Sequence, residues 1–164
     1  MRHQPFIISE KFPVSVEKMF ALWTNPDHLS HWFGPAGVKI VRHSMDLRVG
    51  GIYHFCLQTP DGQLMWGKWI FREIDAPKRL VWIHSFSDER GGLTRHPLSD
   101  TWPLQLVSTV NFQEVDGVTT VTFQWDTHNA TEIEQQTFDN AHESMRQGWG
   151  GSLAQLSAYV TSLA

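Results

Sequence analysis

The chain has 164 residues, a formal net charge of −4 and a sequence pI near 6.1, so its size suits one domain, residues 1–164. The thirteen Lys and Arg are scattered, which excludes the basic footprint of a nucleic-acid-binding protein or of a membrane-surface protein. Cys56 is the only cysteine, and the chain has neither a signal-peptide pattern nor an apolar run of about 20 residues, so we expect a soluble, cytoplasmic protein with no membrane insertion.

The first elements are a short strand and two short helices. Residues 6–12 have strand character, and the helix that follows has Ser15 as its N-cap. A second helix begins at Asn25, with Pro26 in the first helical position, where its missing N–H costs nothing. Gly34-Pro35 ends it.

From residue 37 onward the hydrophobic period changes to two, and β-branched and aromatic residues dominate. Gly, Pro and Asp clusters punctuate the segments as turns. Apolar residues alternate with Thr, Asn and Gln, which is typical of an antiparallel sheet with one buried face. The predicted strands are 38–46, 51–58, 64–74, 79–86, 104–115 and 118–126.

A long polar connection, residues 87–103, precedes the last two strands, and loops of this length are often functional or mobile. The final helical segment begins at Thr131, which has capping-box spacing to Glu134. We expect a break near 139–140 and a long helix over 141–162. That helix must cover the apolar face of the sheet, because no other element is long enough.

Glycines interrupt the long helix around its largest side chain. Gly148, Gly150 and Gly151 surround Trp149, and each costs a helix interior about 1 kcal/mol relative to Ala. We hypothesise that the missing side chains let the sheet or the short helices approach closely and leave room for Trp149 in a cavity wall. A kink or tight packing without any ligand is the alternative.

The ordered set of motifs resembles one family over nearly the whole chain. PVSVEKMFALWTNPDHLSHWFGP, DLRVGGIYHF, PDGQLMWGKWIFREIDAPKRLVW, GVTTVTFQW, NATEIEQQTF and SMRQGWGGSLAQLSAYV occur in the order found in the SRPBCC (START-like, helix-grip) superfamily, in its Hsp90 ATPase activator homologue (AHSA1-like) branch. The resemblance implies an α+β fold in which a curved, seven-stranded antiparallel sheet wraps around the C-terminal helix and encloses a cavity. It implies no particular reaction.

Eight Trp, ten Phe and two Tyr are either a Trp-rich core or the wall of that cavity. His84 follows Leu80 and Trp82 in strand phase, so it could be a polar group in an apolar wall, and it is the only candidate for a catalytic residue. The candidate wall residues are Trp32, Phe33, Tyr53, Phe55, Trp69, Phe71, Trp82, His84, Phe112, Phe123, Trp125, Met145 and Trp149.

Other titratable groups give weaker signals. His28 and His31 share a helix face, but no sequence pattern indicates the third and fourth ligands that a metal site needs. We therefore predict neither a metal nor a cofactor. Cys56 reads as a buried, inert thiol. Asp46, Arg48 and Glu73 could form a carboxylate–cation pair at the rim of the sheet.

Three functions remain. The first is non-catalytic binding of a small hydrophobic ligand, flat and aromatic or isoprenoid-like. The second is an enzyme like the polyketide cyclases and dehydratases, in which His84 acts as a general base. The third is an interaction module for an Hsp90-type chaperone, which is less favoured because the chain begins directly at the first strand, whereas the eukaryotic relatives use an additional N-terminal domain. Uncovered edge strands leave a homodimer open, but no specific residue supports one.

Overall fold

The computed structural model describes residues 3–163. The helices are α1 (Val16–Thr24), α2 (Pro26–Trp32), α3 (Glu132–Asn140) and α4 (His142–Leu163). The strands are β1 (Phe6–Phe12), β2 (Lys39–Met45), β3 (Ile52–Gln58), β4 (Leu64–Asp75), β5 (Arg79–Ser87), β6 (Leu93–Thr94), β7 (Leu106–Val115) and β8 (Val118–Thr127). The α+β fold expected from the sequence is confirmed.

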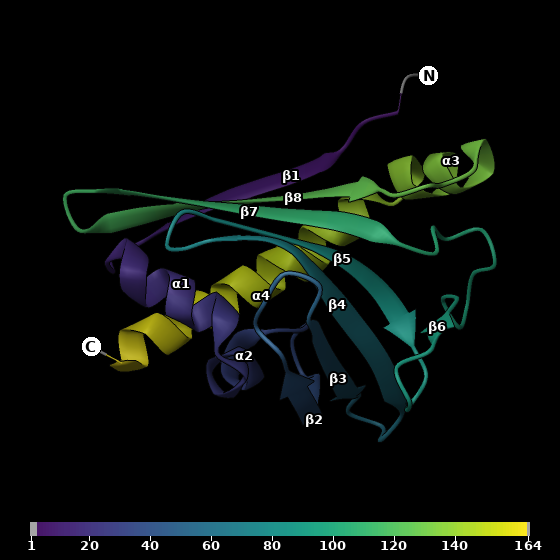
Figure 1. The fold of residues 1–164 in the computed structure, drawn as a ribbon, viewed down its shortest axis with the longest axis horizontal. Helices are drawn as coiled ribbons and strands as arrows, with labels where there is room; N and C mark the ends of the chain where they lie inside the picture. Colours follow the sequence, from purple (N-terminus) through teal and green to yellow (C-terminus); the bar gives the residue numbers. More distant parts are fainter. Residues whose placement is uncertain (1–2, 164) are drawn as a thin grey trace.

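All strands form one antiparallel sheet in the order β1-β8-β7-β5-β4-β3-β2, and β6 pairs with the end of β5 outside this path. Figure 1 shows the sheet curving around α4, with α1 and α2 beside the C-terminal half of the helix and α3 at its N-terminal end. β6 is an addition to the seven expected strands. It lies in the connection 87–103, where only two residues pair with β5.

The helix ends follow the predicted capping chemistry. The side chain of Ser15 accepts a hydrogen bond from the backbone N–H of Lys18, and that of Asn25 accepts one from Asp27. Thr131 and Glu134 form a reciprocal capping box at the start of α3. α3 ends at Asn140, and Ala141 separates it from α4, so the expected break is present.

The concave face of the sheet carries an aromatic core. The rings of Trp69 in β4 and Trp82 in β5 stack with centroids 4.0 Å apart. Trp23 of α1 packs edge-on against Trp32 of α2, and the indole of Trp32 donates a hydrogen bond to the carbonyl of Leu22. These contacts hold α1 and α2 against the sheet. The N-terminal half of α4 faces the ends of β3 to β5.

Of the three residues grouped as a candidate ion pair, two pair with each other and the third pairs elsewhere. Arg48 pairs with Asp46 inside the turn between β2 and β3 at 2.6 Å, whereas Glu73 pairs with Arg79 across β4 and β5 at 3.0 Å. Asp46 and Arg48 thus form an ion pair at the rim of the sheet, whereas Glu73 belongs to a separate pair with Arg79.

Candidate functional site

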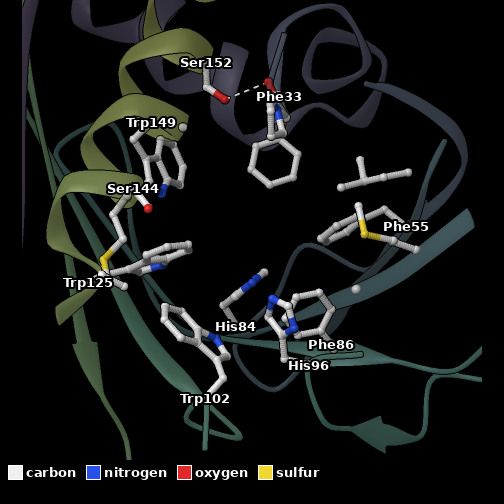
Figure 2. A pocket seen from close by; sticks show the side chains of 18 of the residues that line it. Phe33, Phe55, His84, Phe86, His96, Trp102, Trp125, Ser144, Trp149 and Ser152 are labelled. Atoms are coloured by element: carbon white, nitrogen blue, oxygen red, sulfur yellow. Dashed lines mark hydrogen bonds between the residues drawn. The ribbon is translucent and has the colours of Figure 1, made fainter. Parts of the chain in front are cut away.

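A cavity of about 540 Å³ lies between the N-terminal half of α4, the ends of β3 to β5 and the connection that follows β5. Aromatic side chains surround it, and none of its lining residues is Lys, Arg, Asp or Glu. Figure 2 shows the side chains turned toward a common open space. The lining residues are Phe33, Gly34, Pro35, Phe55, Leu57, Met65, Trp66, Gly67, His84, Phe86, His96, Trp102, Trp125, Ala141, Ser144, Met145, Gly148, Trp149 and Ser152.

α4 contributes one face of the cavity through residues spaced three and four apart. Met145, Gly148, Trp149 and Ser152 all line it, as the period of a helix requires. Trp149 is held from behind, because its ring stacks on Phe123 of β8 with centroids 3.8 Å apart. The helix thus presents a fixed aromatic surface and a bare stretch of backbone to the cavity.

The glycines of α4 do not permit a close approach. A Cβ added at Gly148, Gly150 or Gly151 would meet no atom within 4 Å outside the local helix backbone. The hypothesis that these glycines let the sheet or the short helices approach is therefore wrong. Gly148 borders the cavity and leaves space in it, whereas Gly150 and Gly151 are not part of the wall.

Two side chains of α4 fasten the corner between α2 and β2. The hydroxyl of Ser152 donates to the carbonyl of Gly34 at 2.8 Å, and the amide of Gln155 donates to the same oxygen at 2.6 Å. Gly34 has a φ of +108°, a conformation that favours glycine. This anchoring places Phe33 in the cavity wall, with its ring edge-on to Phe55 at 5.4 Å between centroids.

A true close approach occurs in β4. Gly67 lies opposite Phe55 in the β3–β4 register, and a Cβ at this position would sit 2.8 Å from the Phe55 ring. Only a glycine lets that ring lie against the strand. The sheet wall of the cavity therefore depends on Gly67 rather than on the glycines of α4.

His84 is the polar group of the sheet wall. Its ring faces the cavity from β5 and stacks on Trp125 of β8, with centroids 5.4 Å apart and planes inclined by 28° (Figure 2). The indole of Trp125 donates to the hydroxyl of Ser108 at 2.8 Å, which fixes the ring behind His84. Among residues 3–163, His84 has no hydrogen-bond partner, and burial lowers its pKa to about 4. The imidazole is therefore neutral at neutral pH.

The connection after β5 closes one side of the cavity with His96 and Trp102 (Figure 2). Arg95 fastens it, because its guanidinium donates to the carboxylate of Glu134 on α3 at 2.8 Å and to the carbonyl of Trp102 at 3.4 Å. The backbone hydrogen bond from Thr131 and the Arg95 guanidinium lower the pKa of Glu134, so the pair is ionised at neutral pH. The connection 87–103, predicted to be functional or mobile, thus forms part of the cavity wall.

The structure brings some of the thirteen candidate wall residues to the cavity and leaves the others in the core. Those that line the cavity are Phe33, Phe55, His84, Trp125, Met145 and Trp149. Those buried away from it are Trp32, Tyr53, Trp69, Phe71, Trp82, Phe112 and Phe123. Sequence reasoning did not name His96 and Trp102, although both lie in the connection 87–103 that it singled out.

The remaining titratable candidates have structural contacts. His28 shares a 2.7 Å hydrogen bond with the hydroxyl of Tyr159, and His31 stacks on the same ring. Within residues 3–163 no group of three or more His, Cys, Asp or Glu side chains is placed to hold a metal ion. Cys56 is buried on the sheet, and burial raises the pKa of its thiol. None of these groups reaches the cavity.

Comparisons with known proteins support the fold described above. The family model described as Activator of Hsp90 ATPase homolog 1-like protein matches residues 13–161. None of the curated proteins compared with the chain matches it. No helix within residues 3–163 is long and apolar enough to cross a membrane.

Solved structures from several bacteria share the fold. A protein of Arthrobacter aurescens has a TM-score of 0.77 and 27% identity, covering 96% of this chain and 86% of its own. A protein of Nitrosomonas europaea has a TM-score of 0.75 and 23% identity, with 96% and 94% covered. The AHSA1 protein of Silicibacter pomeroyi has a TM-score of 0.73 and 17% identity, with 98% and 100% covered.

Proposed function

Because the chain belongs to the family of Activator of Hsp90 ATPase homolog 1-like proteins and has a cavity lined by aromatic side chains, we propose that it binds a small apolar molecule there without transforming it. The observation that carries this proposal is the cavity itself. Its volume of about 540 Å³ is within the range of small-molecule sites, and its wall combines aromatic rings with a few polar atoms. Burial of an apolar ligand in such a space is favourable by roughly 25 cal/mol per Å² of apolar surface.

Family membership alone is compatible with a ligand-binding domain or with a module that acts on a chaperone. The cavity favours the first of these, because its volume and its aromatic lining suit a small apolar molecule. An enzyme of the cyclase or dehydratase type needs an acid and a base at the reacting atoms. His84 has a pKa lowered to about 4, which makes it a weak base, and no carboxylate lines the cavity beside it.

The experiment uses the neutral dye N-phenyl-1-naphthylamine, whose fluorescence rises when it leaves water for an apolar site. Titration of the protein is expected to give saturable fluorescence with one dye molecule per chain. Native mass spectrometry of the same mixture measures this stoichiometry directly. Fluorescence that rises without saturation, or no rise at all, would contradict the proposal.

Two variants of α4 locate the dye. Gly148→Leu places a side chain in the open space of the cavity, and we expect it to weaken dye binding at least tenfold. Gly151→Leu is the matched control, because the same substitution one turn along the helix also meets no atom within 4 Å but lies outside the cavity wall. Its dye affinity should equal that of the unmodified protein. Equal affinities for both variants would place the dye elsewhere.

A further inference from the structure

The cavity wall has a polar side formed by two histidines. The rings of His84 in β5 and His96 in the following connection both contact the ring of Phe86, with centroids 6.4 Å and 4.9 Å away. Figure 2 shows both imidazoles turned toward the open space, across from Phe33. The two polar rings therefore form one polar edge of a largely aromatic wall, to which α4 adds the hydroxyls of Ser144 and Ser152.

The hydrogen-bonding roles of the two rings differ. The Nδ1 atom of His96 accepts a hydrogen bond from the backbone N–H of Leu98 at 2.9 Å, so the neutral ring carries its proton on Nε2 and can only donate there. His84 makes no hydrogen bond to any residue between 3 and 163, so its ring still has one donor and one acceptor to offer. A complementary group must accept from His96 and can also donate to His84.

The charge of the wall limits the ligand further. No Lys or Arg lines the cavity, so a buried carboxylate or sulfonate would lack a counter-ion. Burial lowers the pKa of His96 as well as that of His84, and neither imidazole supplies a positive charge at neutral pH. Transfer of an anion into this space is correspondingly unfavourable.

We infer that the ligand is an uncharged aromatic alcohol whose hydroxyl group lies between His84 and His96. This inference rests on the proposed function and specifies its ligand class. A hydroxyl both accepts and donates, so it satisfies the Nε2–H of His96 and the free acceptor of His84 at the same time. The aromatic part then lies against Trp125 and Phe33, where flat apolar surfaces face the cavity.

The test measures displacement of N-phenyl-1-naphthylamine by three compounds that share one ring system: 2-naphthol, naphthalene and 2-naphthoate. We expect 2-naphthol to bind at least tenfold more tightly than naphthalene, because a site that hydrogen-bonds a hydroxyl rejects the analogue lacking it. We expect 2-naphthoate, which is anionic at neutral pH, to bind more weakly than naphthalene. Equal affinities for 2-naphthol and naphthalene would overturn the inference, as would tight binding of 2-naphthoate.

Variants of the two histidines test whether their rings hydrogen-bond the hydroxyl group of 2-naphthol. His84→Phe and His96→Phe keep an aromatic ring in each place but remove its hydrogen-bonding groups, so the ratio of 2-naphthol affinity to naphthalene affinity should fall toward one in both. His43→Phe is the control, because His43 is exposed and lies outside the cavity wall, and it should keep the full preference. A preference that survives both cavity variants would overturn the assignment. Failure of N-phenyl-1-naphthylamine itself to bind would instead contradict the proposed function.

Discussion

Trp149 of α4 lies against Phe123 of β8 with ring centroids 3.8 Å apart and planes inclined by 29°. The same indole is nearly parallel to Trp23 of α1, at 6.0 Å and 7°. One side chain thus joins the long helix to the sheet and to the first helix, while its edge remains part of the cavity wall. The packing of the core and the shape of the cavity are therefore coupled at this residue.

Replacement of Trp149 by Ala should destabilise the protein strongly. Deletion of a buried Trp ring costs about 3–5 kcal/mol, because apolar contacts are lost and a void remains. Urea unfolding followed by circular dichroism measures the free energy of unfolding. Trp149→Phe, which keeps a ring on Phe123, should lose clearly less. Equal stability of Trp149→Ala and the unmodified protein would contradict the coupling.

Alanine at Gly150 or Gly151 should stabilise the protein. Neither position lies in the cavity wall, and a Cβ at either one meets no atom within 4 Å. The gain is about 0.5–1 kcal/mol for each substitution, because Ala loses less backbone entropy than Gly on helix formation. Thermal and urea unfolding measure it. A loss of stability would show that the glycines have a packing role after all.

Strand periodicity predicted which residues of β5 share one face of the sheet. Leu80, Trp82, His84 and Phe86 share a face by alternation, and the structure places His84 and Phe86 in the wall. Alternation cannot tell how far along a strand the cavity extends, however. Trp69 and Trp82 face the same way as the wall residues, yet they stack on each other in the core because α1 and α2 cover that end of the sheet.

Contacts between distant segments explain the rest of what sequence reasoning missed. His96 and Trp102 belong to the wall because Arg95 joins their connection to Glu134 of α3, and nothing in the local pattern announces this pairing. The requirement for glycine at position 67 likewise depends on another segment of the chain. Its need for glycine arises from the Phe55 ring on the neighbouring strand, so it is visible only once the β3–β4 register is known.

The pKa of His84 predicts a loss of stability in acid. Burial lowers this pKa from 6.5 to about 4, so the unfolded chain binds a proton more readily than the folded protein over this range. The stability that the buried, neutral ring of His84 contributes is complete above pH 6.5 and is lost as the pH falls toward about 4. His84→Phe should therefore lose less stability than the unmodified protein between these values in urea unfolding. His43→Phe serves as the exposed control, and identical pH profiles for all three proteins would contradict the prediction.

His3 should show the opposite dependence. Its ring contacts Asp126 at 2.6 Å and Asp139 at 2.8 Å, which joins the N-terminal segment to β8 and α3. Burial alone would lower the pKa of His3, but the hydrogen bonds and charges of the two carboxylates outweigh it and raise the pKa above 6.5. The stabilisation is complete below pH 6.5 and is lost as the pH rises through the folded-state pKa.

His3→Gln tests this dependence, because glutamine keeps hydrogen-bonding capacity without the positive charge. The variant should be less stable than the unmodified protein below pH 6.5, and the difference should narrow in alkaline solution. Urea unfolding over a pH series measures both. A stability difference that stays constant with pH would contradict the ionic contribution of His3.

The most direct test of ligand binding in the cavity uses the eight Trp indoles. In proton–nitrogen NMR spectra of isotope-labelled protein, each indole N–H gives its own signal. On addition of N-phenyl-1-naphthylamine, the signals of the four wall residues Trp66, Trp102, Trp125 and Trp149 should shift most. Those of the buried core residues Trp23, Trp32, Trp69 and Trp82 should shift least. Unchanged wall signals at saturating dye, or shifts confined to the core indoles, would contradict ligand binding in the cavity.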